Sequence, residues 1–298
     1  MFWRSSRLHC LVAVIVVTLM GGVCGAWAQG YGAPVDGMGN TSYGTPNMQP
    51  AEPWAGDSPL VWGEVRTWKA DNWTWAAGAR AGVGNDMDAE LTFFHMDTSG
   101  EDPIAGVVRD SEATLVGLNF KWVAHRGEKL LVSVIPGAEF PIGDTKGRNP
   151  ALPATAVSDE IIPVISVPVE YTCPRGTLVR VTPRYIGFDA SPELADGSTI
   201  DGFGNVLALA FGATHDFGQY SAMADGAVVI SKYNSINKNT NRPTDEFVWS
   251  VGGSWHPTDR PVRVDLFVTN AAGPTAASSI IATPDQSIGV GLRVSGEF

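Results

Sequence analysis

The sequence has little charge and lacks long apolar runs. Asp, Glu, Lys and Arg make up 17% of its 298 residues, whereas ordinary soluble proteins carry roughly a quarter. After the first thirty residues, no apolar run approaches the roughly 18–20 residues with which a helix crosses a bilayer. The chain therefore lacks the pattern of a helical membrane protein and departs from that of a typical soluble one.

Basic residues are also few. The chain has 20 Lys and Arg against 31 Asp and Glu, for a net charge of −11. Such a surface would repel phosphate backbones, so we expect no nucleic-acid partner. A hydrophobic share of 44% argues against disorder for most of the chain.

Cysteine is scarce, with three residues in all. Cys10 and Cys24 lie in an N-terminal segment that we expect to be removed, which leaves Cys173 without an internal partner. No Cys/His group has the spacing of metal ligands. We therefore expect no metal site and no cofactor.

The N-terminus has the features of a secretory signal peptide. Arg4 and Arg7 precede an apolar stretch over 11–20, and Ala26-Trp27-Ala28 forms a cleavage site before Gln29. The alternative is a membrane anchor that stays uncleaved. We predict a signal peptide over 1–28, a flexible Gly/Pro-rich segment over 29–58 and a folded domain over 59–298.

The folded domain shows the two-residue period of β-strands. Its clearest example is the last segment, where Ile288, Val290, Leu292 and Val294 alternate with small or charged residues. Similar alternation predicts about twelve strands, near 59–69, 73–83, 87–96, 112–123, 130–140, 160–171, 177–188, 203–214, 220–232, 246–255, 262–270 and 287–298. Pro136, Pro163, Pro168 and Pro183 fall inside these strands, and we expect bulges there because proline donates no ladder hydrogen bond.

The connections between these strands alternate between short and long. An even strand count, short periplasmic turns and long extracellular loops are typical of transmembrane β-barrels. The sequence therefore predicts an all-β fold, a transmembrane antiparallel up-and-down β-barrel with about twelve strands.

Aromatic residues support this interpretation. Five of them occupy the apolar face of a strand close to a short turn or to the terminus, where a membrane-interface ring is expected: Trp122, Tyr171, Tyr220, Trp255 and Phe298. The alternative is a set of ordinary core aromatics in a soluble β protein.

The last strand resembles that of bacterial outer-membrane β-barrel proteins. Alternate apolar residues ending in an aromatic match that pattern, at Ile288, Val290, Leu292, Val294 and Phe298, whereas Gly296 departs from it. The resemblance implies the bacterial outer membrane as location, recognition by the barrel-assembly machinery, and outer-membrane lipid and lipopolysaccharide as surroundings.

A second, shorter resemblance is to the MetA-pathway of phenol degradation family of outer-membrane transporters. Residues 133–144 read SVIPGAEFPIGD, with Pro141-Ile142-Gly143-Asp144 where that family carries a strand-ending turn. This resemblance implies uptake of a small hydrophobic or aromatic solute.

Charged residues on the opposite strand face are expected to line the lumen, at Arg80, Glu90, Lys121, Glu139, Glu170, Arg180, Arg184, Asp225, Arg263, Asp265 and Arg293. Confined charges must be paired, hydrated or bound to a ligand. They either select small solutes in an open channel or form ion pairs that brace a closed wall. Whether residues 29–58 plug the lumen is equally open.

Three functions fit these observations. The leading hypothesis is a porin-like channel for passive uptake of a small solute, and the alternative is a closed structural or adhesion barrel that acts through its loops. An outer-membrane lipid hydrolase is the remote alternative, with His95 and a loop serine as the pair left open. No serine and histidine stand at a recognisable catalytic spacing, so we expect no enzyme. Oligomeric state stays open.

The barrel prediction has a direct test on a gel. Protein extracted from outer membranes should migrate differently before and after boiling, because a closed hydrogen-bonded wall has no edge from which detergent can unzip it. A soluble periplasmic protein without a heat-dependent shift would contradict the barrel.

Overall fold

The computed structural model describes residues 44–54, 58–68, 72–84, 86–98, 111–142, 161–174, 176–188, 204–237, 242–257, 262–283 and 287–297. The expected signal peptide, Phe298 and most of the long loops lie outside these residues, so what we expect of them stays a prediction.

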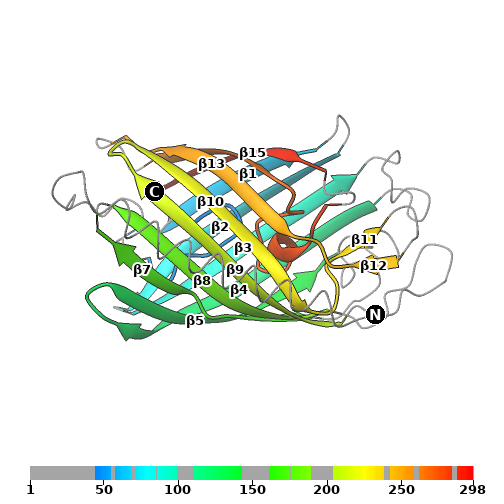
Figure 1. Cartoon of the computed structure of the whole chain (residues 1–298), viewed down its shortest axis with the longest axis horizontal. Coiled ribbons are helices and arrows are strands. Elements are labelled where there is room, and N and C mark those ends of the chain that lie inside the picture. Colours follow the sequence, from blue (N-terminus) through cyan, green and yellow to red (C-terminus); the bar gives the residue numbers. More distant parts are fainter. Residues whose placement is uncertain are drawn as a thin grey trace.

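The structure is a closed antiparallel β-barrel (Figure 1). Its sheet runs in the order β4-β3-β2-β1-β15-β14-β13-β10-β9-β8-β6-β5-β7, and the pairings β4–β5 and β7–β8 complete the ring. The wall strands are β1 (Leu60–Thr67), β2 (Asn72–Gly84), β3 (Met87–Thr98), β4 (Ser111–Arg126), β5 (Leu130–Pro141), β6 (Ile162–Ser166), β7 (Val169–Cys173), β8 (Thr177–Gly187), β9 (Asn205–Asp216), β10 (Tyr220–Ser231), β13 (Val248–Trp255), β14 (Val262–Thr269) and β15 (Gly289–Glu297).

The described wall has twelve strands around the ring, because β6 and β7 are consecutive halves of one strand between β5 and β8. The strand predicted over 160–171 is divided at Val167 and Pro168, since Pro168 has no N–H to continue the ladder. The Pro168 carbonyl oxygen still accepts a hydrogen bond from the backbone N–H of Ser133, at 3.1 Å. The all-β barrel prediction and its twelve strands are confirmed.

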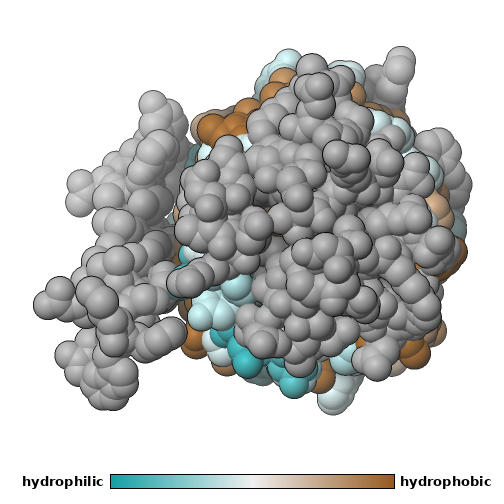
Figure 2. All heavy atoms as spheres, turned by 90° about the vertical axis from the view of Figure 1, so that its right-hand side faces the viewer, coloured by the Kyte–Doolittle hydropathy of each residue, from teal (hydrophilic) through white to brown (hydrophobic). Residues whose placement is uncertain are grey.

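The outer surface follows the predicted alternation. Val290, Leu292 and Val294 on β15 are about half exposed, at 49%, 48% and 46%, and Figure 2 shows hydrophobic residues around the edge of the barrel when it is viewed from the loop end. A wall whose apolar side chains face outward requires lipid rather than water around it.

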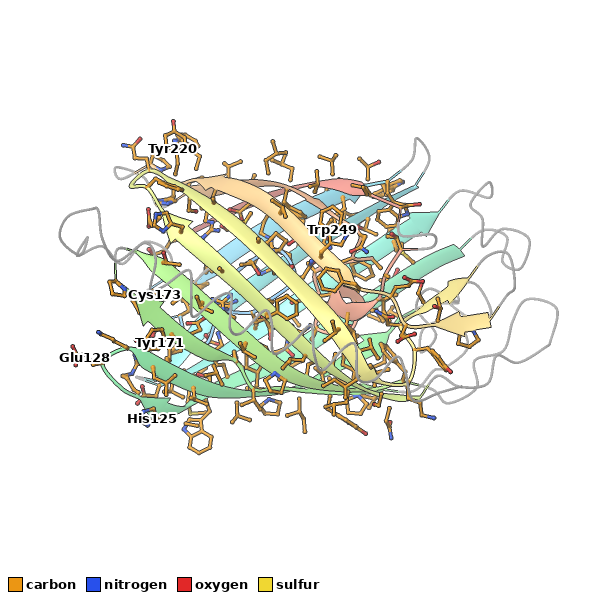
Figure 3. All side chains as sticks on the ribbon, in the orientation of Figure 1. His125, Glu128, Tyr171, Cys173, Tyr220 and Trp249 are labelled. Atoms are coloured by element: carbon orange, nitrogen blue, oxygen red, sulfur yellow. The ribbon has the colours of Figure 1, made fainter. Side chains whose placement is uncertain are left out.

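The expected interface aromatics lie on this outer surface. Trp122, Tyr171, Tyr220 and Trp255 are all exposed, and Tyr171 and Tyr220 lie at the short-turn end of the barrel (Figure 3). Tyr220 pairs with Trp255 across the β10–β13 ladder. The alternative of core aromatics in a soluble β protein is wrong for these four residues.

The barrel interior has two different halves. Towards the long loops, the wall turns apolar side chains inward, among them Phe94, Met96, Leu115, Ile162, Val164, Ile186, Val206, Ala208, Val229 and Val248. Towards the short turns, many inward side chains are charged and most of the others are polar or small. The core of this protein is therefore the inside of the barrel, apolar at one end and ionic at the other.

Two small elements lie outside the wall strands. A small hairpin of β11 (Ser235–Asn237) and β12 (Arg242–Thr244) lies at the loop end (Figure 1). A 3-10 turn, η3 (Ser278–Ile280), follows β14. In the part of the chain that the structure describes, no helix is long and apolar enough to cross a membrane.

Cys173 ends β7 and is disulfide-bonded in the full-length chain. We expected this cysteine to lack an internal partner after signal removal, and Cys10 and Cys24 lie outside the described residues.

Leu292 should be sensitive to charge because it faces lipid in the middle of β15. We expect Leu292→Arg to lower the free energy of unfolding by about 2–4 kcal/mol, and Ile288→Arg, at the loop end, by only about 0–1 kcal/mol. Urea titrations of both variants in lipid vesicles measure this difference. Equal costs at the two positions would contradict the assigned membrane depth.

Candidate functional site: an occluded lumen

The predicted lumen charges are buried inside the barrel. Ladder register places opposite charges directly across from each other, as with Arg80 and Glu90 on β2 and β3 or Glu170 and Arg180 on β7 and β8. The ion pairs are Arg80–Glu90 at 3.6 Å, Lys121–Asp88 at 3.3 Å, Arg180–Glu170, Arg263–Asp265 at 2.6 Å and Arg293–Glu64 at 2.5 Å. These contacts favour ion pairing within the wall, while a role in solute selection stays a prediction.

An N-terminal hairpin occupies the ionic half of the lumen. We call residues 44–54, GTPNMQPAEPW, the plug hairpin. The chain reverses between Thr45 and Met48, whose backbone groups exchange hydrogen bonds at 3.1 and 3.3 Å. Gly44 has a φ of +73°, and a Cβ there would lie 2.4 Å from the Met48 carbonyl oxygen. The described part of the 29–58 segment therefore plugs the lumen.

Wall carboxylates bind this hairpin along its length. Four of them accept hydrogen bonds of 2.7–3.2 Å from it: Asp225, Glu90, Glu170 and Asp88, from Asn47, Gln49, Ala51 and Trp54 respectively. At the exposed rim, Arg126 of β4 donates to the Glu52 carboxylate at 3.0 and 3.2 Å. Wall charges that an open channel would present to solute are thus engaged by the chain itself.

The last long connection occupies the apolar half. We call residues 271–283, which follow β14, the inward loop. Its side chains are small or aliphatic, and Ala277, Ile280, Ile281 and Ala282 are 0–1% exposed. It packs against the apolar wall residues, so closely that a Cβ on Gly273 would lie 2.4 Å from the Phe94 ring.

Two charged wall residues hold this loop. Glu139 of β5 accepts from the Ala277 N–H and the Thr275 hydroxyl, both at 2.8 Å. Arg184 of β8 donates to the Ala276 carbonyl at 3.1 Å and to the Ser279 hydroxyl. Both were expected to line the lumen, and both bind the segment that blocks it.

The plug hairpin and the inward loop nearly meet. The cavity between them has a volume of about 40 Å³ and is lined by Thr45, Met48, Trp62, Glu90, Pro274 and Arg293 among others. This space suits a few water molecules. The barrel is therefore described in a closed state.

Two wall residues and the hairpin tip were missed from the sequence. Glu64 and Arg66 of β1 are 4% and 0% exposed, but the first predicted strand was poorly patterned and gave no clear inner face. Glu64 could have been predicted by pairing the first strand with the last, as barrel closure requires, because it lies opposite Arg293 of β15. The Asn47 contact has no signal in the sequence, since 178 residues separate it from Asp225.

The histidines offer a limited basis for catalysis. His95 Nδ1 lies 2.9 Å from the Thr114 hydroxyl, with the Trp73 and Trp75 rings beside the imidazole at 5.8 and 5.7 Å. The hydroxyl beside His95 is thus that of a strand threonine, rather than that of the loop serine considered above. Within the described residues, no group of His, Cys, Asp and Glu is arranged to hold a metal ion.

Comparisons with known proteins give the fold and no family. No family model and no curated protein matches the sequence. Among solved structures, an outer-membrane channel from Pseudomonas putida F1 is 8% identical, with 90% of this chain and 100% of that chain covered and a TM-score of 0.60. The NanC porin is 11% identical, with 81% and 100% covered and a TM-score of 0.52. The likeness shows that the chain has the fold of outer-membrane β-barrels.

Glu64 should matter more for stability than any exposed ion pair. Its two oxygens accept from the Nε atoms of Arg66 and Arg293 at 2.5 and 2.7 Å, so Glu64→Gln leaves two buried cations without their counter-charge. We expect a loss of about 3–5 kcal/mol in the free energy of unfolding.

The matched control is Arg126→Gln, which removes a half-exposed ion pair and should cost under about 1 kcal/mol. Urea midpoints in lipid vesicles measure both variants. A Glu64→Gln barrel as stable as the Arg126→Gln barrel would show that Glu64 is not needed to hold the guanidinium groups.

Proposed function

We propose that the protein is an outer-membrane channel, closed at rest, for passive uptake of a small solute with a large apolar part. The observation that carries this proposal is that two segments of the chain, rather than side chains of the wall, fill the lumen. A segment can leave without breaking any hydrogen bond of the wall ladder, whereas a lumen filled by the wall itself has no such open state.

The inner wall facing the inward loop supports this reading. Ala76, Ala208, Ala210 and Ala227 are buried there, and such small side chains leave a wide space in a twelve-strand barrel. The inward loop occupies that space mainly through apolar packing, with Glu139 and Arg184 as its charged anchors.

The apolar half of the lumen supports the choice of solute. With the inward loop displaced, the wall would present Phe94, Met96, Leu115 and their neighbours to whatever enters from the loop end. Such a surface favours apolar groups by about 25 cal/mol per Å² removed from water. The ionic half below it would then be crossed by the solute's polar end.

The closed structural or adhesion barrel is the second candidate, and the occlusion of the lumen favours it. Under that function the plug hairpin and the inward loop are permanent parts of the interior. The two functions differ in whether displacing both segments opens a path for ions.

Planar-bilayer conductance separates them. Gly273→Leu places a side chain where Phe94 and Ser278 already lie, so it should push the inward loop out. Asn47→Ala removes the side-chain bonds of the plug hairpin to Asp225 and Arg66. We expect the wild type to open rarely, each variant to open more often, and the double variant to give sustained single-channel steps.

Gly63→Ala is the control, because a Cβ at Gly63 meets nothing closer than 4.0 Å. It should conduct as the wild type does. A double variant that is folded, as heat-dependent migration reports, and yet silent would overturn the channel in favour of the closed barrel.

A further inference from the structure

Among its contacts with each inserted segment, the wall holds one peptide bond of each in the same way. For the plug hairpin the bond joins Pro46 and Asn47, and for the inward loop it joins Ala276 and Ala277. In both, arginine donates to the carbonyl and a carboxylate accepts from the N–H. Two segments that share no sequence are thus recognised through one chemistry.

The site at the hairpin tip is the more elaborate of the two. Arg66 and Arg293 both donate Nη2 to the Pro46 carbonyl, at 3.1 and 3.0 Å. Arg66 also donates Nη1 to Asn47 Oδ1 at 3.1 Å. Asp225 accepts the Asn47 N–H at 3.2 Å and the side-chain amide at 2.9 Å. Two guanidinium groups therefore face acceptors on one side, and a carboxylate faces donors on the other.

Wall residues hold the two arginines of this arrangement. Glu64 fixes the Nε edge of both arginines, the Arg66 guanidinium lies 5.3 Å from the Phe267 ring centre, and that of Arg293 lies 5.4 Å from the Trp62 ring centre. A displaced hairpin would remove the Pro46 carbonyl from both arginines and the Asn47 donors from the Asp225 carboxylate.

The hairpin is a weak match for these charges. A neutral carbonyl and amide satisfy two cations and an anion, whereas charged partners form hydrogen bonds roughly twice as strong. A carboxylate beside an ammonium group has the same order of acceptor and donor as the Pro46–Asn47 peptide bond, separated by one more covalent bond. An α-amino acid therefore fits the site with full charges of the correct sign.

The position of this site favours a ligand with an apolar side chain. Arg66 contacts both inserted segments, since its Nη1 also donates to the Ala271 carbonyl of the inward loop at 3.3 Å. The site thus lies where the ionic half meets the apolar half, so a ligand held there by its charged end can extend an apolar group towards Phe94 and its neighbours.

We propose that Arg66, Arg293 and Asp225, positioned by Glu64, form a binding site for zwitterionic amino acids with apolar side chains, and that the plug hairpin is its tethered competitor. The inference deepens the proposed channel by naming its solute class. Ligand and hairpin exclude each other from the tip site, so binding the solute favours the displaced hairpin.

Calorimetric titration of the full-length protein in detergent micelles tests this without any need for conductance. The probes are L-phenylalanine, L-phenylalaninamide, which lacks the carboxylate, and 3-phenylpropanoate, which lacks the ammonium group. Each analogue loses a charged hydrogen bond, so we expect each to bind at least about tenfold more weakly than L-phenylalanine. Equal binding of the three, or no binding of L-phenylalanine, overturns the site.

Competition has a signature that a merely structural cluster would not give. Asn47→Ala weakens the hairpin tip and should raise the affinity for L-phenylalanine several-fold, whereas Arg66→Gln should lower it at least about tenfold. Lys129→Gln, which removes a cation from the exposed short turn between β4 and β5, is the matched control and should leave affinity unchanged. Unchanged or lower affinity in Asn47→Ala overturns the competition.

The ligand comparison keeps the test decisive if Arg66→Gln fails to fold, because it uses the wild-type protein. Binding without any conductance in the double variant would leave this site standing and overturn the channel. Conductance without binding would overturn this site and leave the channel standing.

Discussion

A barrel in lipid must satisfy every backbone hydrogen bond within its own wall, and it does so by closing into a ring. Closure then commits every second side chain to a confined interior. Here β1 meets β15, and the same ladder that closes the ring sets Glu64 against Arg293. The features of the lumen follow from this constraint, because charges that cannot reach bulk water must find partners inside.

The interior meets that requirement in two ways. Register pairs many charges across neighbouring strands, as for Arg80 and Glu90. Other charges, such as Asp225 and Glu139, take their partners from the plug hairpin and the inward loop. Bonds of the second kind can be exchanged for bonds to a solute, since the wall ladder does not depend on them. Under the proposed channel function, the wall is rigid and its filling is removable.

Because the lumen has an apolar and an ionic half, the two segments that fill it are held by different kinds of contact. The inward loop is held by packing at the loop end, and the plug hairpin is held by polar contacts nearer the short turns. Arg66 contacts both. If the proposed site is correct, a ligand at that position would compete with the contacts of Arg66 to both segments.

Local pattern alone was enough to predict the wall. The two-residue period of segments such as 288–294, the alternation of short and long connections, and the positions of Trp122 and Tyr220 depend only on neighbours along the chain. Proline chemistry indicated the break at Pro168, but the bulges expected at Pro163 and Pro183 are wrong, because both prolines lie in ladders without a register shift. The first strand was predicted without its inner face, because Leu60, Val61 and Trp62 are consecutive bulky residues and blur the alternation.

The sequence by itself therefore determined the class of fold, its strands and the inward-facing charges of the strands after the first. Only the tertiary structure decided what those residues bind. Asn47 and Asp225, or Glu139 and Ala277, lie more than a hundred residues apart, and contacts between a folded-in segment and a wall have no period along the chain. Closure of the lumen could not be predicted from the sequence for the same reason. An empty and a filled barrel have the same strand pattern, and only the packing of two irregular segments distinguishes them.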